Sequence, residues 1–230
     1  MKDRITSITS TDIKVFGVFK CLTGEELNRI SLTSIITYLE KGSIVFNEGC
    51  RIKGLYVIID GFVKTYKIGF RGKEQIFQFL KKGDVLGYES VLNFHNSNHA
   101  ISVMNDVKLI FIPLETLSYI LENNFAFRLS ILQLGCKELK VAQEFITDIT
   151  QKKIEGRVVD LLLHLKDNYK VTENSLLDIS LNRKDFANKI GACKESVIRI
   201  LSDLRRNKMI ETKGNRIGVL DTEKLKQNYH

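Results

Sequence analysis

The segment Asn182–Arg206 constrains the fold more tightly than any other part of the sequence. It reads N-R-K-D-F-A-N-K-I-G-A-C-K-E-S-V-I-R-I-L-S-D-L-R-R, and its apolar residues recur at helical spacing on both sides of Gly191. Gly191 permits a tight turn, and Ala187 is small where two helices must approach closely. We therefore predict a helix-turn-helix. Its inward residues are expected to be Phe186, Ala187 and Ile190 in the first helix and Val197, Ile200, Leu201 and Leu204 in the second.

The start of the second helix carries an outward polar group made of Lys194, Glu195, Ser196 and Arg199. Arginine can fork onto guanine O6 and N7, and glutamate can accept from cytosine N4, so this group is suited to reading bases in the major groove of DNA. The alternative is a surface ion pair between Glu195 and Arg199, worth only about 0.3–0.5 kcal/mol. The two interpretations are compatible, because such a pair could orient both side chains toward bases.

A β-hairpin is predicted directly after the two helices. Met209–Lys213 and Arg216–Leu220 have strand-like sequences and flank Gly214 and Asn215, which suit a tight turn. Lys213 and Arg216 beside the tip are expected to contact DNA phosphate, as are Arg183 and Lys184 at the amino end of the first helix. The charge agrees: residues 151–230 hold 17 Lys and Arg against 11 Asp and Glu, most of the net +8 of the chain.

Short β-branched and aromatic runs separated by glycines fill the region from Ile35 to Ile112. Strands of this length and spacing favour a β-sandwich or barrel. Pro113, the only proline, is expected to close the last strand and to open a short helix, where its missing N–H is no loss.

A long helix is predicted from Phe125 to about Thr150. Its apolar residues follow a seven-residue repeat at Phe125, Leu132, Leu139 and Ile146, with Leu129 and Cys136 at the alternate positions. Such a stripe favours a partner helix and hence a homodimer, although it could instead pack on its own β domain. The predicted domains are a β domain over residues 1–122, the long helix over 123–150 and a DNA-binding domain over 151–230.

Three stretches of the sequence resemble the Crp/Fnr superfamily. They are K-G-S-I-V-F-N-E-G with L-Y-V-I-I-D-G-F-V, the long helix, and R-K-D-F-A-N-K-I-G-A-C-K-E-S-V-I-R-I-L. The resemblance implies an α+β fold with an amino-terminal, jelly-roll-like double-stranded β-roll, a long dimerisation helix and a carboxy-terminal winged helix-turn-helix. It implies a homodimeric bacterial transcription regulator that binds double-stranded DNA and acts on RNA polymerase.

By the same resemblance, Glu195 and Arg199 correspond to the base-reading pair of the family and Lys194 to the adjacent basic contact. The implied target is a palindrome with a GTGA-like core in each half-site. Ile198 stands where the family commonly has a small residue.

The candidate effector pocket departs from the cyclic nucleotide-binding pattern. Members that bind cyclic nucleotides have a stretch resembling F-G-E-x-x-L followed by R-S-A or R-T-A, whereas this chain has L-G-Y-E-S-V-L followed by N-H-A. No arginine occurs between Arg71 and Arg128, and a buried phosphate without a cation is costly. We predict no tight binding of cyclic AMP, and the effector is unidentified. The candidate pocket residues are Gly87, Tyr88, Glu89, Ser90, Asn98 and His99.

Other classes of site find little support in the sequence. The four cysteines form no C-x-x-C pair or iron–sulfur spacing, so we expect them mostly to fill small apolar sites, with Cys193 packed in the helix-turn-helix. Redox sensing through a single thiol stays open. His95 and His99 lack further ligands, so no metal and no cofactor are predicted.

We likewise find no catalytic constellation and predict no enzyme. The sequence has neither the run of about 18 apolar residues that a membrane span needs nor an apolar signal core, so a cytoplasmic protein is expected. A different class of function is a ligand-binding sensor module whose winged domain mediates protein contacts.

Overall fold

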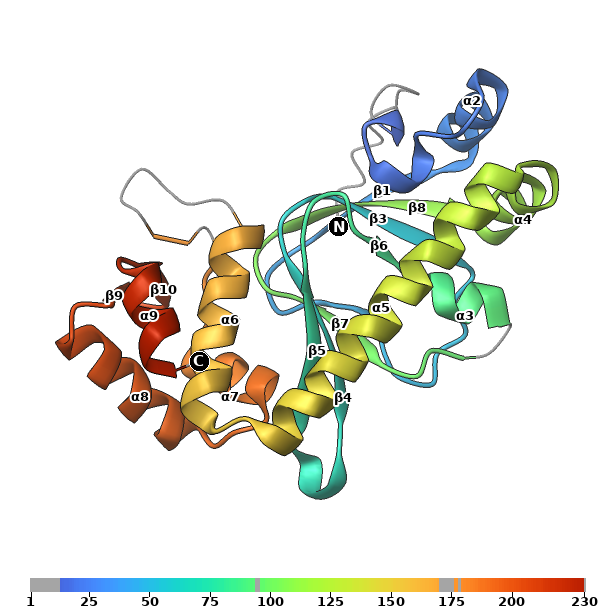
Figure 1. Ribbon diagram of the computed structural model, residues 1–230. Coiled ribbons are helices and arrows are strands. Elements are labelled where there is room, and N and C mark those ends of the chain that lie inside the picture. Colours follow the sequence, from blue (N-terminus) through green and yellow to red (C-terminus); the bar gives the residue numbers. More distant parts are fainter. Residues whose placement is uncertain (1–12, 94–95, 170–175, 178, 230) are drawn as a thin grey trace. The chain divides into compact units, whose positions relative to one another are not determined.

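Two units make up the chain in the computed structural model, which describes residues 13–93, 96–169, 176–177 and 179–229 (Figure 1). The first unit comprises Met1–Lys67 and Gln78–Lys140, and the second comprises Ile68–Phe77 and Val141–His230.

Eight antiparallel strands form two four-stranded sheets in the amino-terminal part of the chain, in the orders β1-β8-β3-β6 and β2-β7-β4-β5. The core lies between the sheets, because side chains of both are fully buried, among them Val57 and Ile110 of one sheet and Val63 and Ile101 of the other. The predicted β-roll is therefore confirmed. The strands are β1 (Ile35–Leu39), β2 (Ile44–Phe46), β3 (Gly54–Asp60), β4 (Val63–Ile68), β5 (Glu74–Leu80), β6 (Val85–Leu86), β7 (Ala100–Val103) and β8 (Val107–Pro113).

Gly61 shows why these turns need glycine. It follows β3 with a φ of +89°, a value that other residues rarely adopt. A Cβ at this position would lie 2.4 Å from the carbonyl oxygen of Asp106, so any side chain would collide with the neighbouring backbone. The glycine therefore permits both the turn and the close approach of two chain segments.

The helices of the first unit precede the roll in sequence, follow it or, in the case of α3, lie between two of its strands. They are the 3-10 turn η1 (Gly17–Phe19), α2 (Gly24–Thr33), α3 (Tyr88–Asn93), α4 (Leu114–Asn123) and the first turns of α5 (Phe125–Gln151). Pro113 is the residue that precedes α4, with a φ of −61°. Asn124 starts α5, since its Oδ1 accepts a hydrogen bond from the Phe127 N–H at 2.9 Å.

The long helix α5 contacts the roll through one face only. Phe127 and Ile131 are buried in the core of the first unit. The residues of the seven-residue stripe lie elsewhere on the helix and are exposed: Phe125, Leu129, Leu132, Leu139 and Ile146 have between 43% and 71% of their surface accessible, and Cys136 is exposed as well.

The second unit contains the winged helix-turn-helix. Its elements are the 3-10 turn η2 (Phe70–Gly72), the end of α5, α6 (Ile154–Asn168), α7 (Arg183–Ile190), α8 (Lys194–Arg206), β9 (Ile210–Lys213), β10 (Arg216–Val219) and α9 (Thr222–Tyr229). Its buried side chains come from most of these elements, including Leu162, Phe186, Val197, Ile217 and Leu225. The predicted helix-turn-helix and hairpin are both confirmed.

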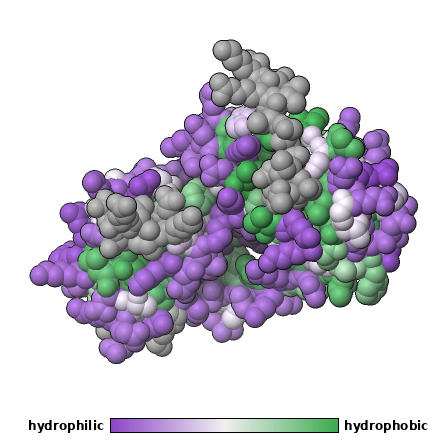
Figure 2. Space-filling model, turned by 90° about the horizontal axis from the view of Figure 1, so that it is seen from above, coloured by the Kyte–Doolittle hydropathy of each residue, from purple (hydrophilic) through white to green (hydrophobic). Residues whose placement is uncertain are grey.

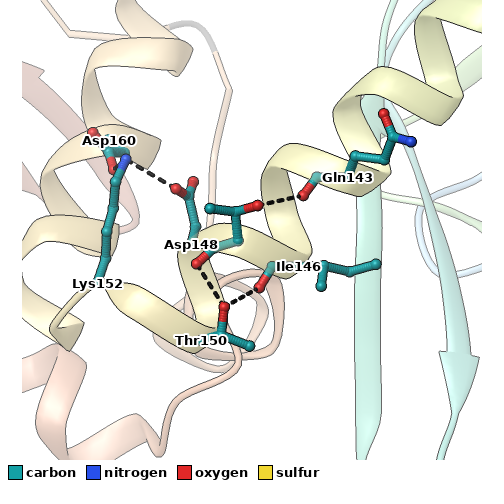
Figure 3. A network of polar contacts seen from close by, with 7 residues as sticks. Gln143, Ile146, Asp148, Thr150, Lys152 and Asp160 are labelled. Carbon is teal, nitrogen blue, oxygen red and sulfur yellow. Dashed lines mark hydrogen bonds and ion pairs between the residues drawn. The ribbon is translucent and has the colours of Figure 1, made fainter.

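A polar network joins the end of α5 to α6 within the second unit (Figure 3). The Lys152 ammonium lies 2.9 Å from Asp148 of α5 and 2.7 Å from Asp160 of α6. The Thr150 hydroxyl donates to the carbonyl oxygen of Ile146 at 3.0 Å. Because one ammonium bridges carboxylates on both helices, the network favours a defined bend at this junction.

The cysteine prediction is wrong for most positions. Cys50, Cys136 and Cys193 are exposed, and Cys21 is half-buried. Cys193 fails as a core residue because it is the residue that starts α8, where its side chain faces outward.

The surface in Figure 2 is mostly hydrophilic, with smaller apolar patches. In the described part of the chain, no helix combines the length and the apolar character needed to cross a membrane.

Candidate nucleic-acid interface

The turn between α7 and α8 is built on Gly191. Its φ of +67° and ψ of 37° place it in the left-handed region, where glycine ends a helix without strain. Its N–H donates to the carbonyl oxygen of Ala187, which closes the last turn of α7. At the other end of α7, the Asn182 side chain accepts from the Asp185 N–H at 2.8 Å. Both ends of α7 are thus fixed by local sequence.

Helix α8 has one buried and one exposed face. Val197 and Leu204 are fully buried, and Ile200 and Leu201 nearly so. On the opposite face, Lys194, Glu195 and Arg199 are exposed and Ser196 is half-buried. The structure therefore brings the four predicted base-reading residues together on the first turn and a half of one helix, where all but Ser196 project into solvent.

Glu195 and Arg199 form no ion pair with each other or with any other residue that the structure describes. The surface-pair interpretation is not seen in this structure. Ile198 lies on the same face and is 42% exposed. An apolar side chain therefore stands between charged neighbours at the surface of α8.

Ser196 contacts a residue that sequence reasoning placed in the core. Its hydroxyl lies 3.0 Å from the thiol of Cys193, an exposed residue. Hydrogen bonding from Ser196 lowers the pKa of Cys193, because it favours the thiolate. The exposure of Cys193 could have been predicted from its place directly before the first turn of α8, where small residues that can form hydrogen bonds are preferred.

Two of the residues predicted to contact phosphate lie opposite each other in the hairpin. Strands β9 and β10 pair antiparallel, with Lys213 opposite Arg216, and both side chains are exposed. Gly214 has a φ of +60°, the positive value that the first central residue of a type II′ turn requires.

The other two predicted phosphate contacts lie at the start of α7 and differ from each other. Lys184 is exposed, whereas Arg183 is half-buried. Burial lowers the pKa of Arg183, and its Nη1 is buried without a hydrogen-bond partner among the described residues.

One basic residue of the helix-turn-helix faces inward. The Lys189 ammonium donates to the carbonyl oxygen of Phe77 at 2.6 Å and lies 5.1 Å from the centre of the Phe145 ring. Burial lowers the pKa of Lys189 to about 8. Gln75 supports the same end of α7, since its amide donates to the carbonyl oxygen of Asn188 at 2.7 Å. All these residues belong to the second unit, and no local pattern in the sequence indicates their contacts.

The candidate effector residues of the first unit divide into two neighbourhoods. Gly87, Tyr88 and Ser90 are buried and Glu89 is half-buried around the start of α3. Asn98 is exposed and His99 is buried, and the His99 ring lies 2.7 Å from the Asn98 amide oxygen and near Phe46. The charges that act on His99 are Glu48 and Lys67, whereas those that act on Tyr88 and Glu89 include Glu138 of α5. Glu138 is a site residue that sequence reasoning missed.

His99 is a poor partner for an anion. Burial lowers its pKa, so the ring is neutral near pH 7. His95, its suggested partner in a metal pair, lies outside the described residues, and the residues that are described contain no cluster of three or more metal-ligating side chains.

Comparisons with known proteins agree with this arrangement. The model of the cyclic nucleotide-binding domain matches residues 36–124, and that of the Crp-like helix-turn-helix domain matches residues 156–228. The fumarate and nitrate reduction regulatory proteins of Yersinia pestis and Escherichia coli are each 27% identical over 191 residues, which cover 82% of this chain and 76% of the relative.

Solved structures share the fold. FixK2 from Bradyrhizobium japonicum matches with a TM-score of 0.78 and 21% identity, covering 85% of this chain and 96% of its own. The c-di-GMP responsive regulator CLP from Xanthomonas campestris matches with a TM-score of 0.73 and 16% identity, covering 86% and 99%. The two matched family models fall on the β-roll and on the winged helix-turn-helix. The chain belongs to the Crp/Fnr family of DNA-binding transcriptional regulators.

Proposed function

We propose that this regulator binds a palindromic DNA site as a homodimer, with α8 of each subunit in the major groove of one half-site. The observation that carries the proposal is the exposed first turn of α8, where Lys194, Glu195 and Arg199 project from a helix whose other face is buried. Helix-turn-helix proteins read base edges with polar side chains at the amino-terminal end of their second helix, and α8 exposes such side chains there.

Base discrimination follows from the chemistry of these side chains. Arg199 can donate two hydrogen bonds to guanine, and Glu195 can accept one from cytosine. Neither Glu195 nor Arg199 forms an ion pair in the described chain, so no ion pair of these two side chains has to be broken before DNA binds. Ser196 is oriented by Cys193 and is expected to assist rather than to lead.

Phosphate contacts are expected to position α8 in the groove. Lys213 and Arg216 present two adjacent cations at the hairpin tip. Lys184 is exposed at the start of α7, and a phosphate oxygen would supply the partner that Arg183 Nη1 lacks. Such contacts give affinity that depends on salt but carries no sequence information.

A second copy of the chain is the proposed partner of α5. The exposed stripe lies on a helix of 27 residues, repeats every three to four residues from Phe125 to Leu139 and continues seven residues later at Ile146; its members are Phe125, Leu129, Leu132, Cys136, Leu139 and Ile146. Different residues, Phe127 and Ile131, attach the helix to the roll. The stripe is thus available to a twin helix, and a dimer supplies the two copies of α8 that a palindrome with half-sites about one DNA turn apart, roughly 34–36 Å, requires.

The β-roll is proposed to sense an effector other than cyclic AMP. The positions that correspond to the phosphate-binding arginine hold an exposed Asn98 and a buried His99 with a lowered pKa, so no cation would neutralise the cyclic phosphate. Calorimetric titration with cyclic AMP should give no binding at micromolar concentration. A micromolar dissociation constant would refute this part.

We further expect the DNA-bound dimer to act on RNA polymerase in the cytoplasm and to catalyse no reaction. Transcription in a purified system, with and without the regulator, would test the first of these expectations.

The decisive experiment compares two arginine variants of α8. A preferred duplex is first selected from random sequences, and affinity for it and for single-mismatch duplexes is measured by fluorescence anisotropy. Arg199→Ala should lose about 1–3 kcal/mol of discrimination at one base pair of each half-site. Arg205→Ala removes an exposed cation from the last turn of the same helix and should keep the sequence preference. Unchanged discrimination in Arg199→Ala would show that α8 does not read bases in this way.

A further inference from the structure

A polar cluster of Tyr88, Glu89 and Glu138 lies inside the first unit and has no role in the DNA interface. Tyr88 and Glu89 begin α3, directly after β6, and Glu138 lies on α5. Helix α5 passes against the Tyr88 ring, because a Cβ added to Gly135 would lie 4.0 Å from Tyr88 Cε2. Residues 50 positions apart in the sequence thus meet at one place.

The cluster contains polar atoms that lack partners. Tyr88 is only 3% exposed, yet its hydroxyl makes no hydrogen bond of normal geometry, and Oε2 of Glu89 is likewise buried without a partner among the described residues. Buried polar groups are nearly always hydrogen-bonded, and the contacts of Tyr88 and Glu89 with Glu138 do not reach normal hydrogen-bond geometry, so the cluster has room for a further donor. The Tyr88 hydroxyl faces Glu138, since its contact with that carboxyl and the charges of Glu138 and Glu89 add to burial in raising the pKa of Tyr88.

The missing partner should carry positive charge. Burial and the neighbouring Glu138 raise the pKa of Glu89 to about 7. Burial also raises the pKa of Glu138, and the charge of Asp84 adds to this effect. Burial raises the pKa of Asp84, and the nearby cations Lys81 and Lys137 oppose this effect only in part. Neither Glu89 nor Glu138 has an ion pair with a described residue.

We propose that this cluster binds an organic cation bearing N–H donors, an ammonium or amidinium group, as the recognised part of the effector. The inference rests on the proposal that the roll is the sensing part of the regulator. The ligand N–H groups would donate to Glu89 Oε2, to the Tyr88 oxygen and to Glu138. A cation held there would connect α3 to α5, so its binding would bear directly on the helix that carries the exposed stripe.

Other ligand classes fit these groups less well. An anion would meet two carboxylates and no arginine, which is unfavourable in a partly buried site. A divalent metal ion would need more ligands than the cluster offers, and the described residues include no set of three His, Cys, Asp or Glu placed to hold one. An N–H donor satisfies both unpartnered oxygens and both charges at once.

Calorimetry on the full-length protein at pH 7 tests the inference with methylguanidinium and methylammonium chloride as probes. Both should bind at millimolar concentration or better and should release protons, because the cation displaces protons from the two carboxyls. Proton release is read from the dependence of the heat on the ionisation enthalpy of the buffer. Tetramethylammonium, a cation without N–H donors, and inorganic phosphate should bind at least about tenfold more weakly.

Three variants locate the site. Glu89→Gln and Glu138→Gln keep the side-chain shape and should weaken methylguanidinium binding by about 10- to 100-fold, and Tyr88→Phe, which keeps the packed ring, should weaken it measurably. Glu122→Gln removes an exposed carboxylate from α4 and should change nothing. Circular dichroism confirms that each variant is folded, and Tyr88→Phe serves if a Gln variant is not.

Equal heats for wild-type protein and both Gln variants would overturn the inference, as would phosphate binding tighter than methylguanidinium. DNA binding by each variant is measured in parallel. If the protein binds DNA sequence-specifically but binds no cation, this inference alone is rejected. If it binds the cation but no DNA, the proposed function is rejected, and the assignment of the cluster as a cation site stands.

Discussion

Lys213 and Arg216 are paired directly opposite each other at the open end of the β9–β10 hairpin, separated only by Gly214 and Asn215. Opposed residues in an antiparallel pair have Cβ atoms about 4.5–5.5 Å apart, and like charges at that distance destabilise the hairpin. Both side chains are exposed, so both cations are accessible to a polyanion such as DNA. The pairing therefore supports the assignment of the hairpin tip to DNA phosphate.

Removing either cation should change the salt dependence of DNA binding. Lys213→Ala or Arg216→Ala is expected to reduce the slope of log K against log salt by about 0.9, the value for one lost phosphate contact. Affinity should fall by a similar factor for all DNA sequences. Anisotropy titrations at several salt concentrations measure both quantities. Lys20→Ala, an exposed lysine of the first unit, should leave the slope unaltered, and an unaltered slope in both hairpin variants would remove the wing from the interface.

Ile198 predicts an apolar contact with DNA. Its side chain is 42% exposed between Lys194 and Arg199 on the reading face of α8, where the methyl group of thymine is a suitable partner. Replacing the contacted thymine with deoxyuridine removes that methyl and should cost wild-type protein about 0.8 kcal/mol, the value of one buried methyl or methylene group. Ile198→Ala should bind both duplexes equally. If the variant still distinguishes the two bases, another residue makes the contact.

The exposed stripe of α5 predicts a dimer that a single charge can dissociate. Leu132→Glu places a carboxylate within an apolar helix seam, where it cannot be solvated, so the dimer should dissociate into folded monomers. Sedimentation equilibrium measures the molecular mass, and DNA affinity for the palindrome should fall with it. Leu32→Glu is the matched control, because Leu32 is 78% exposed on α2 and outside the stripe. A Leu132→Glu protein that stays dimeric would place the subunit contact elsewhere.

The parts of the fold that the sequence predicted are those in which local patterns report burial. The inner residues of α7 and α8, such as Phe186 and Val197, repeat with the helical period and are buried, and Gly191 marks the turn between them. The roll followed from short alternating runs and from glycines such as Gly61, whose conformation few other residues tolerate. In these cases a few neighbouring residues are sufficient to determine the environment.

The predictions failed or were incomplete where a residue depends on distant partners. Nothing in the local sequence marks Lys189, yet it is half-buried against Phe77 and Phe145, which are far away in the sequence. Glu138 has no local feature that connects it with Tyr88, because the contact arises only when α5 packs beside α3. Periodicity indicates which face of an element is buried but not which residues lie on the other side.

The buried carboxyls of the first unit predict how its stability depends on pH. Burial raises the pKa of Glu89 from near 4.5 to about 7, so the folded state holds a proton in that range that the unfolded chain has lost. The free energy of unfolding contributed by Glu89 must therefore fall as the pH rises from 4.5 to 7. Burial lowers the pKa of His99 below 6.5, and this shift has the opposite effect on stability. Just below pH 6.5 the unfolded chain binds a proton at His99 that the folded protein does not, so the free energy of unfolding rises as the pH rises to 6.5.

Glu89→Gln separates the two effects, because it removes the carboxyl and leaves His99 unchanged. At pH 8 the variant should be more stable than the wild type by about 1–2 kcal/mol, since an amide costs nothing to keep uncharged, and at pH 4.5 the two proteins should be nearly equal. Urea unfolding at several pH values measures the difference, with hydrogen exchange of α3 and α5 amides to assign it to the first unit. In wild-type protein, a stability that rises between pH 6.5 and 8 would mean that Glu89 is ionised at little cost, which would contradict the raised pKa of Glu89.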